Sequence, residues 1–400
     1  MKRLLPYLRK NGIETRIIFF AANAKQLPAY RYFSEEGFKC KLIFWERFNE
    51  EKIIEILDDV KEFPPDIFIP NYFPVACYAA KWIKESGIPT VCILHNDDKY
   101  HIKLIDLFAA GDEKYKVSAM IGVSQLLTQL IKWQAAANAI VEYLPYGAPV
   151  PEQTAVLNTD DTLKLVYIGR MMENQKRISE VSKVFCRVAR EIAGTECTLY
   201  GSGKDLPKVL EILKNEGNGL PVNYEGQLDT ENVQQHLLQN HIFVLLSDYE
   251  GIPISLMEAM ACGLVPVCLN IRSGMTELIL QNETGFLVND RNDDFVDTIK
   301  KIKSDYSLWQ KISVAARKKI TEEFSDEICN KRWLDFLIGL HSKKKVMQPL
   351  IIPTLTELRS LHYPSEFAGS SNPIPGAVFV PLYKLRSWAG RIRRNYLKTH

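Results

Sequence analysis

Short apolar runs alternate with longer helical patterns through about the first 290 residues of this 400-residue chain. The runs are rich in Val, Ile and Phe and mostly lack polar–apolar alternation, which is typical of strands buried on both faces of a parallel sheet. This strand–helix–strand rhythm occurs twice and predicts an α/β fold with two doubly wound, Rossmann-like domains. The expected strands are 15–20, 41–45, 66–71, 90–95 and 119–124 in the first half, and 163–169, 198–201, 222–226, 241–247, 266–271 and 285–288 in the second.

A domain boundary is expected at 145–151, where three prolines and a glycine interrupt regular structure. The polar stretch that follows reads as a linker. Two doubly wound domains joined there would leave a cleft that faces the carboxyl ends of both sheets. The predicted division is 1–148 for the first domain, 149–162 for the linker, 163–340 for the second domain and 341–400 for a C-terminal extension.

The start of the first domain is unusual. Residues 1–11 have the pattern of a helix stopped by Gly12, and the first expected strand comes only after it. A doubly wound domain normally opens with its central strand and a glycine-rich turn, ahead of such a helix. We therefore expect the first strand of the N-terminal domain to be missing, and we predict a longer natural form that extends upstream.

The alternation stops near residue 340, and a Pro/Ser-rich stretch leads to a basic segment at 381–400. Apolar residues recur there at helical spacing among six Lys/Arg residues. This pattern predicts a basic amphipathic helix, which can lie on an anionic membrane surface or dock on its own protein. The apolar positions are Leu382, Leu385, Ala389, Ile392 and Tyr396.

Composition excludes several classes of function. The formal net charge of +2 is too close to neutral to indicate a nucleic-acid partner. Eight scattered cysteines without a C-x-x-C pair indicate buried thiols in a reducing compartment. Residues 1–10 lack the apolar stretch of a signal peptide, and no run approaches the roughly 18 apolar residues of a membrane span. We expect a cytoplasmic protein that can lie at the membrane periphery through its basic end.

The segment 247–263, SDYEGIPISLMEAMACG, is the most informative for chemistry. It follows an apolar strand directly, Pro253 suits a first helical turn, and Gly263 suits the position just past the last. A glycine turn would then lead into a short helix whose free N–H groups face the cleft. Such a helix start is a ready site for a phosphate.

Two carboxylates accompany this helix start. Glu250 lies in the loop and Glu258 lies roughly a turn and a half into the helix. Carboxylates beside a phosphate are better suited to accept hydrogen bonds from sugar hydroxyls than to touch the phosphate. The alternative, a capping Glu250 and a surface Glu258, is disfavoured because Glu258 stands among apolar neighbours, where an idle carboxylate is costly.

The seven-residue spacing of Glu250 and Glu258 resembles the E-x7-E signature of retaining GT-B glycosyltransferases of the group 1, or GT4-type, family. Further segments agree in order, and the resemblance spans about 163–335, with weaker similarity over 12–150. These segments are YIGR at 167–170, Lys176, LYGSG at 199–203, YEG at 224–226 and GFLV at 285–288.

The resemblance implies a role for each matched residue. Arg170 and Lys176 would neutralise the donor diphosphate, whose leaving group gains negative charge as the glycosidic bond breaks. Glu258 would hold the ribose hydroxyls of the nucleotide. Glu250, with the backbone of Gly251, Ile252 and Pro253, would hold the transferred sugar.

His95 ends the strand at 90–95 on the N-terminal side of the expected cleft. In the family a histidine at such a strand end contacts the sugar, and the alternative is a satisfied histidine at a strand terminus. Asp97 and Asp98 follow it and are interpreted as loop acids. Since cations and a helix end can stabilise the diphosphate, neither a metal nor another cofactor is required. No Ser-His-Asp or Cys-His arrangement is visible in the sequence.

These observations predict a glycosyltransferase that moves a sugar from a nucleotide diphosphate to an acceptor hydroxyl, saccharide or lipid-linked. The resemblance implies retention of anomeric configuration and a place in polysaccharide, lipopolysaccharide or glycolipid synthesis. Two alternatives stay open. One is a sugar-nucleotide epimerase of the same fold, and the other is a truncated homologue that binds nucleotide sugars without transferring them.

Overall fold

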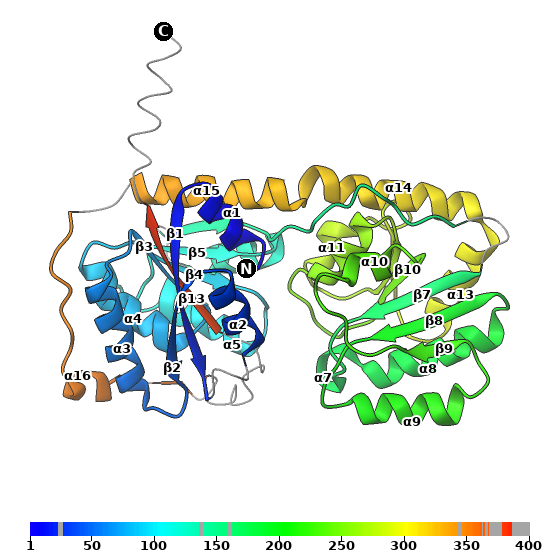
Figure 1. Cartoon of the computed structure of the whole chain (residues 1–400), viewed down its shortest axis with the longest axis horizontal. Helices are drawn as coiled ribbons and strands as arrows, with labels where there is room; N and C mark the ends of the chain where they lie inside the picture. The colour runs from blue at the N-terminus through cyan, green and yellow to red at the C-terminus, as the bar shows by residue number, and fades with distance from the viewer. Residues whose placement is uncertain are drawn as a thin grey trace, which may run out of the picture. The chain divides into compact units, whose positions relative to one another are not determined.

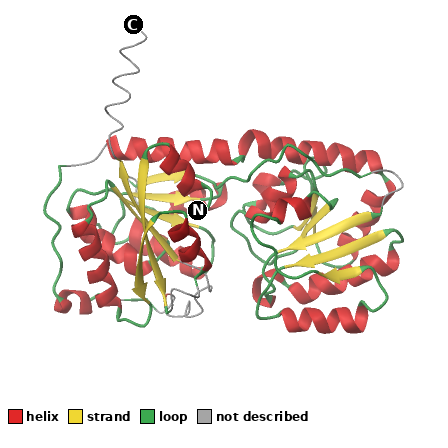
Figure 2. Ribbon diagram, in the orientation of Figure 1, coloured by secondary structure: helices red, strands yellow, loops and turns green. Residues whose placement is uncertain are grey.

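The structure is a computed structural model that describes residues 1–22, 27–135, 139–157, 162–342, 346–361, 363–364, 367 and 378–385, the last as a backbone strand. Contacts divide the chain into two compact units, Met1–Pro145 with Asn330–His400, and Tyr146–Cys329. Each unit has one sheet with helices packed against it (Figures 1 and 2). The predicted α/β class with two strand–helix units is confirmed.

The sheet of the first unit has seven strands in the order β2-β1-β13-β3-β4-β5-β6. Its strands are β1 (Ile13–Ala21), β2 (Lys39–Phe44), β3 (Ile67–Asn71), β4 (Thr90–Leu94), β5 (Ala119–Gly122), β6 (Ile140–Tyr143) and β13 (Val378–Leu385). Its helices are α1 (Leu4–Lys10), α2 (Pro28–Glu35), α3 (Asn49–Glu62), α4 (Pro74–Glu85), α5 (Lys99–Ile105), the π-helix η2 (Asp106–Ala110), α6 (Gln125–Gln134) and α16 (Leu355–Arg359).

Strands β3 and β4 are buried at every position, as their unbroken apolar sequences predict for central parallel strands. The predicted helix before the first strand is present as α1. It ends at Lys10 with Asn11 as its C-cap, and Gly12 follows with φ of +85°, a left-handed conformation that suits glycine after a helix.

Strand β13 lies between β1 and β3, the central position that the sequence left without a strand. It runs antiparallel to both, whereas the other neighbouring pairs in this sheet are parallel. The helix predicted over 381–400 is therefore wrong for 381–385, and residues 386–400 lie outside the described residues. The physical reason is pairing. Buried strands β1 and β3 present backbone N–H and C=O groups that require partners, and a backbone extended over 378–385 supplies them.

The sheet of the second unit has six strands in the order β12-β11-β10-β7-β8-β9, all parallel. They are β7 (Leu163–Ile168), β8 (Thr195–Tyr200), β9 (Val222–Tyr224), β10 (Ile242–Leu245), β11 (Val265–Leu269) and β12 (Phe286–Val288). Its helices are α7 (Glu173–Lys176), α8 (Ile178–Glu191), α9 (Leu206–Glu216), α10 (Val233–Leu237), α11 (Ile254–Ala261), α12 (Met275–Leu278), α13 (Asp293–Ser304) and α14 (Tyr306–Glu323). Helices α8 and α9 cover one face, and α11 and α14 cover the other (Figure 1).

Helix α15 (Asp326–Ser342) has its first residues in the second unit and the rest in the first. The second unit therefore ends at Cys329 rather than at the predicted residue 340. The cause is packing: Trp333 is 1% exposed and its indole N–H donates to the Pro145 carbonyl at 3.1 Å. Leu337 is buried as well, so this half of α15 belongs to the first unit's core.

The cysteines are free thiols, and seven of the eight are buried while Cys40 is half-buried. This confirms the prediction of buried thiols. Among the described residues, no helix is both long and apolar enough to cross a membrane.

Candidate functional site

The carboxyl end of β7 leads directly into the first predicted site residues. Gly169 and Arg170 follow the strand, and the LYGSG turn after β8 approaches them closely. A Cβ at Gly201, where φ is +139°, would stand 1.8 Å from the Gly169 carbonyl oxygen, and one at Gly203 would stand 2.3 Å from that of Met171. Only glycine permits this contact, so both G-x-G positions are required for the two strand ends to meet.

The loop 247–253 continues from β10 into α11 at the same edge of the sheet. The predicted helix is present. It begins at Ile254, so Pro253 is its N-cap and not a residue of its first turn, and Gly263, with φ of +84°, follows its end. The Gly251 carbonyl accepts from Gly274 N at 2.7 Å, which ties the loop to the turn after β11. Glu258 lies within α11 and is half-buried.

Two predicted site residues contact each other. The Lys176 ammonium donates to Glu250 Oε1, and both side chains are 9% exposed. Lys176 ends the short helix α7, and Glu250 lies in the loop after β10. The structure thus brings together the residue predicted to bind the diphosphate and the residue predicted to bind the sugar.

Arg170 reaches the same cluster through Gln175, a residue that the sequence analysis did not identify. Arg170 Nη2 donates to Gln175 Oε1 at 2.5 Å, and Gln175 Nε2 donates to the Tyr249 carbonyl at 3.0 Å. Gln175 is 5% exposed. The Asp248 amide also donates to the Gln175 carbonyl at 2.9 Å, so α7 and the loop are joined by side-chain and backbone bonds.

Three further charged residues hold this loop and also escaped the sequence analysis. Asp248 forms an ion pair with Arg177, whose Nε lies 2.8 Å from its Oδ2, and accepts a hydrogen bond from Arg291. Arg291 Nε donates to the Leu246 carbonyl at 2.7 Å. No local signal could have found Arg291, because it is 43 residues beyond Asp248 in the chain.

The tyrosine of the YIGR segment, Tyr167, is fully buried beneath the site, and its hydroxyl donates to the Arg170 carbonyl at 2.9 Å. Burial, and then the neighbouring charge of Glu250, raise the pKa of Tyr167 well above its usual value. It therefore stays a neutral hydrogen-bond donor that orients the backbone of Arg170.

His95 belongs to the first unit, at the end of β4, and is described within that unit alone. Its Nε2 lies 2.8 Å from Asn71 Oδ1, where Asn71 has φ of +56° at the end of β3. Tyr72 makes an edge-on ring contact with His95 at 5.0 Å. Burial, followed by the charge of His101, lowers the pKa of His95 to about 3, so the imidazole is neutral at physiological pH.

Asp98 lies in the loop before α5, as predicted, and it has a structural role there. Its carboxylate caps α5 by accepting from His101 N at 2.9 Å, and it also pairs with His101 Nδ1 at 2.8 Å. The helix start requires an acceptor for its free N–H groups, and aspartate is a favoured cap. The described residues contain no group of three or more His, Cys, Asp or Glu side chains placed to hold a metal ion.

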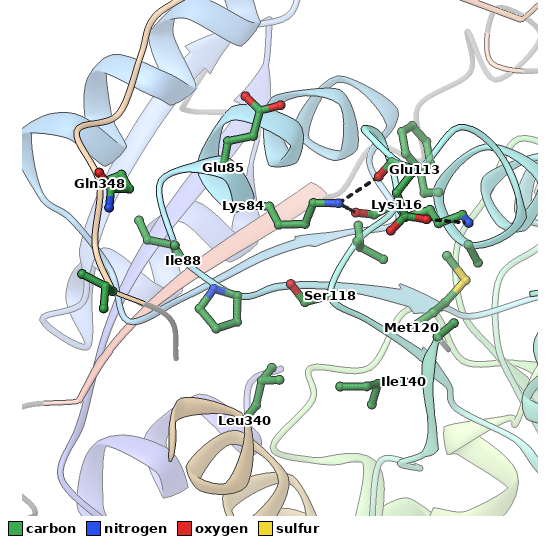
Figure 3. A pocket seen from close by; sticks show the side chains of 17 residues that line it. Lys84, Glu85, Ile88, Glu113, Lys116, Ser118, Met120, Ile140, Leu340 and Gln348 are labelled. Atoms are coloured by element: carbon green, nitrogen blue, oxygen red, sulfur yellow. Dashed lines mark hydrogen bonds and ion pairs between the residues drawn. The ribbon is translucent and has the colours of Figure 1, made fainter. Parts of the chain in front are cut away.

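A pocket of about 860 Å³ lies elsewhere in the first unit, beside the amino ends of β4 and β5 (Figure 3). Lys84 points toward its rim and donates to the carbonyls of Glu113 and Lys116 at 3.0 and 2.6 Å. Lys116 in turn pairs with Glu113 at 2.9 Å. Both lysines therefore form bonds within the rim of the pocket. The pocket lies at the opposite edge of the sheet from His95.

Comparison with known proteins matches most of the second unit to a family model. Residues 150–319 match the model described as glycosyl transferases group 1, which confirms the resemblance identified from the sequence. The chain is 26% identical over 266 residues to the N-acetyl-alpha-D-glucosaminyl L-malate synthase of Bacillus anthracis, covering 63% of this chain and 68% of that protein. It is 24% identical to the poly(glycerol-phosphate) alpha-glucosyltransferase of Bacillus subtilis. That match covers 65% of this chain and 39% of the Bacillus subtilis protein.

A solved structure shows the same fold. The Anabaena protein Alr3699/HepE, solved in complex with UDP and glucose, superposes with a TM-score of 0.64 at 13% identity, over 78% of this chain and 89% of that one. This likeness agrees with the predicted GT-B architecture of two Rossmann-like units.

Proposed function

We propose that this chain, whose residues 150–319 match the model of the group 1 glycosyl transferases, transfers a sugar from a nucleoside diphosphate to an acceptor hydroxyl. The observation that supports it most is the cluster of Arg170, Lys176 and Glu250 at one edge of the second sheet, beside the start of α11. Cations and a carboxylate meet there, as a diphosphate bonded to a sugar requires.

The chemistry of each group follows from its type. Arg170 and Lys176 would bind the diphosphate oxygens and stabilise the negative charge that the leaving group gains. With Lys176 engaged by phosphate, Glu250 would accept hydrogen bonds from sugar hydroxyls, together with the backbone of Gly251 to Pro253. Glu258, half-buried in α11, would accept from the ribose hydroxyls. His95, neutral at physiological pH, would contact the sugar from the first unit.

Uridine diphosphate sugars are the first donors to test, because the Anabaena relative was solved with UDP and glucose. The acceptor in this proposal is a saccharide or lipid-linked hydroxyl of polysaccharide, lipopolysaccharide or glycolipid synthesis, and transfer proceeds with retention. The anomeric configuration of the product, read by NMR, tests retention directly.

The binding experiment is a thermal shift against UDP-, GDP-, ADP- and TDP-sugars on wild type and Glu258→Ala. A ligand at 100 times its dissociation constant adds about 2.7 kcal/mol of stability. We expect one base to stabilise wild type and not the variant. Glu211→Ala, which removes an exposed glutamate of α9, is the matched control and keeps the full shift.

The other outcomes distinguish the alternatives. If no sugar nucleotide shifts the melting temperature of folded wild type, the cluster is not a donor site and the proposal is wrong. A shift without transfer to a panel of hydroxyl acceptors would favour the non-transferring homologue, and a change of the donor's own sugar would favour the epimerase.

We also propose a peripheral membrane contact through the basic end of the chain, because residues 386–400 include five Lys/Arg residues. Sedimentation with anionic liposomes tests it. Deleting 386–400 without reducing the bound fraction would remove this part of the proposal.

A further inference from the structure

The side chain of Gln175 joins two parts of the site that the proposed function treats separately. Its carbonyl oxygen accepts from the Arg170 guanidinium, and its NH2 group donates to the carbonyl of Tyr249, the residue before Glu250. At 5% exposure the amide is shielded from water, so these two bonds have little competition.

The two partners dictate the residue type. A guanidinium can only donate and a backbone carbonyl can only accept, so the bridging group must offer one acceptor and one donor. An amide side chain in one orientation offers its carbonyl oxygen to the guanidinium and its NH2 group to the backbone carbonyl. A carboxylate would serve Arg170 but repel the Tyr249 carbonyl, and it would neutralise the cation that the diphosphate needs.

The neighbours of Gln175 strengthen the connection. Lys176 and Arg177 contact the same loop, at Glu250 and Asp248. Three consecutive residues thus bind three consecutive loop residues, and Gln175 alone also contacts Arg170. Arg170 is otherwise an exposed side chain with many rotamers.

We infer that Gln175 is a positioning residue. It orients the Arg170 guanidinium toward the donor diphosphate and holds it at a fixed position relative to the Glu250 loop. This inference rests on the proposed function, because it assumes that the cluster binds a nucleoside diphosphate. It adds the requirement that Arg170 be pre-oriented, since an unrestrained guanidinium must lose rotamer freedom on binding.

The experiment compares nucleoside diphosphate with monophosphate. Calorimetric titration gives the affinities of wild type for UDP, GDP, ADP and TDP, and then for the monophosphate of the base that binds. We expect Gln175→Ala to lower the preference for diphosphate over monophosphate by about tenfold, the worth of one hydrogen bond to a charged group. A merely structural role would weaken both nucleotides alike and leave the ratio unchanged.

Three variants sharpen the result. Gln175→Met keeps the buried volume without the polar atoms, and it should show the same loss if Gln175→Ala fails to fold. Gln234→Ala is the matched control, because Gln234 Nε2 donates to the Pro149 carbonyl at 3.0 Å away from the cluster, and its ratio should equal that of wild type. In an Arg170→Ala background, Gln175→Ala should change the ratio no further.

Each contrary outcome is decisive. An unchanged ratio in both Gln175 variants, or an additive loss in the Arg170→Ala background, would overturn the positioning role while leaving the proposed function intact. Absence of nucleoside diphosphate binding by folded wild type would overturn the proposed function, and this inference with it.

Discussion

The ammonium of Lys176 and the carboxylate of Glu250 are hydrogen-bonded to each other with only 9% of each side chain exposed. Each charge is therefore the other's counter-ion in a partly water-free site. A diphosphate that attracts Lys176 would release Glu250 toward the sugar. Donor binding would then exchange one ion pair for another instead of burying an uncompensated charge.

Removing either partner of this pair should destabilise the second unit. We expect Glu250→Ala and Lys176→Met each to lower the free energy of unfolding by about 3 kcal/mol, because each leaves one buried charge unpaired. The double variant should recover part of that loss. Urea denaturation measures it, and Lys318→Ala, at an exposed pair with Glu322, is the control that should change little. Equal stability of the single variants and this control would show that the pair is hydrated.

The depressed pKa of His95 predicts a pH dependence of stability in the first unit. Its pKa is about 3 in the folded protein and about 6.5 in an unfolded chain, so the unfolded state binds a proton in this window that the folded state does not. Stability should fall as pH drops below about 6.5, by roughly 2 kcal/mol at pH 5 from this residue alone. His95→Asn should flatten that part of the stability profile, measured by denaturation at a series of pH values. Identical profiles would place the histidine in a solvated setting.

Strand β13 should be necessary for the sheet of the first unit. It pairs with β1 from Ile13↔Leu385 to Phe20↔Val378, between two strands that would otherwise have unpaired buried amides. Truncation after residue 377 should speed amide hydrogen exchange in β1 and β3 while leaving the β4–β5 amides protected at first. Unchanged protection in β1 would mean that its amides find partners without this strand.

Arg291 should matter for donor affinity without touching the donor. It holds the Leu246 carbonyl and Asp248, so Arg291→Ala should loosen the loop that carries Glu250 and weaken nucleoside diphosphate binding by about tenfold. Arg187→Ala, which removes a surface arginine paired with Glu191, is the matched control. The titration described above for Gln175 measures both, and equal affinities would assign Arg291 to stability alone.

Metal removal should leave donor binding unchanged. Arg170, Lys176 and the α11 start supply the positive charge that a diphosphate requires, so EDTA should not reduce the thermal shift by the bound sugar nucleotide. A shift that disappears with EDTA and returns with Mg²⁺ would contradict this and assign the neutralising charge to a cation.

What the sequence alone determined is local or repetitive. The strand–helix rhythm predicted both sheets, because buried parallel strands need continuous apolar runs. The segment around Glu250 and Glu258 predicted a strand, a turn and a short helix, because Pro253 and Gly263 act within one or two residues of where they stand.

Only the tertiary structure decided which distant groups meet. Residues 381–385, the start of the basic, helically spaced segment, belong to strand β13, because unpaired backbone groups in a sheet centre outweigh a weak helical pattern. Gln175, Asp248 and Arg291 carry no sequence signal of their own, since one amide and two charges are common on any surface. Their contacts with Arg170 and the Glu250 loop depend on strand order, which brings the ends of β7, β10 and β12 to one edge of the sheet.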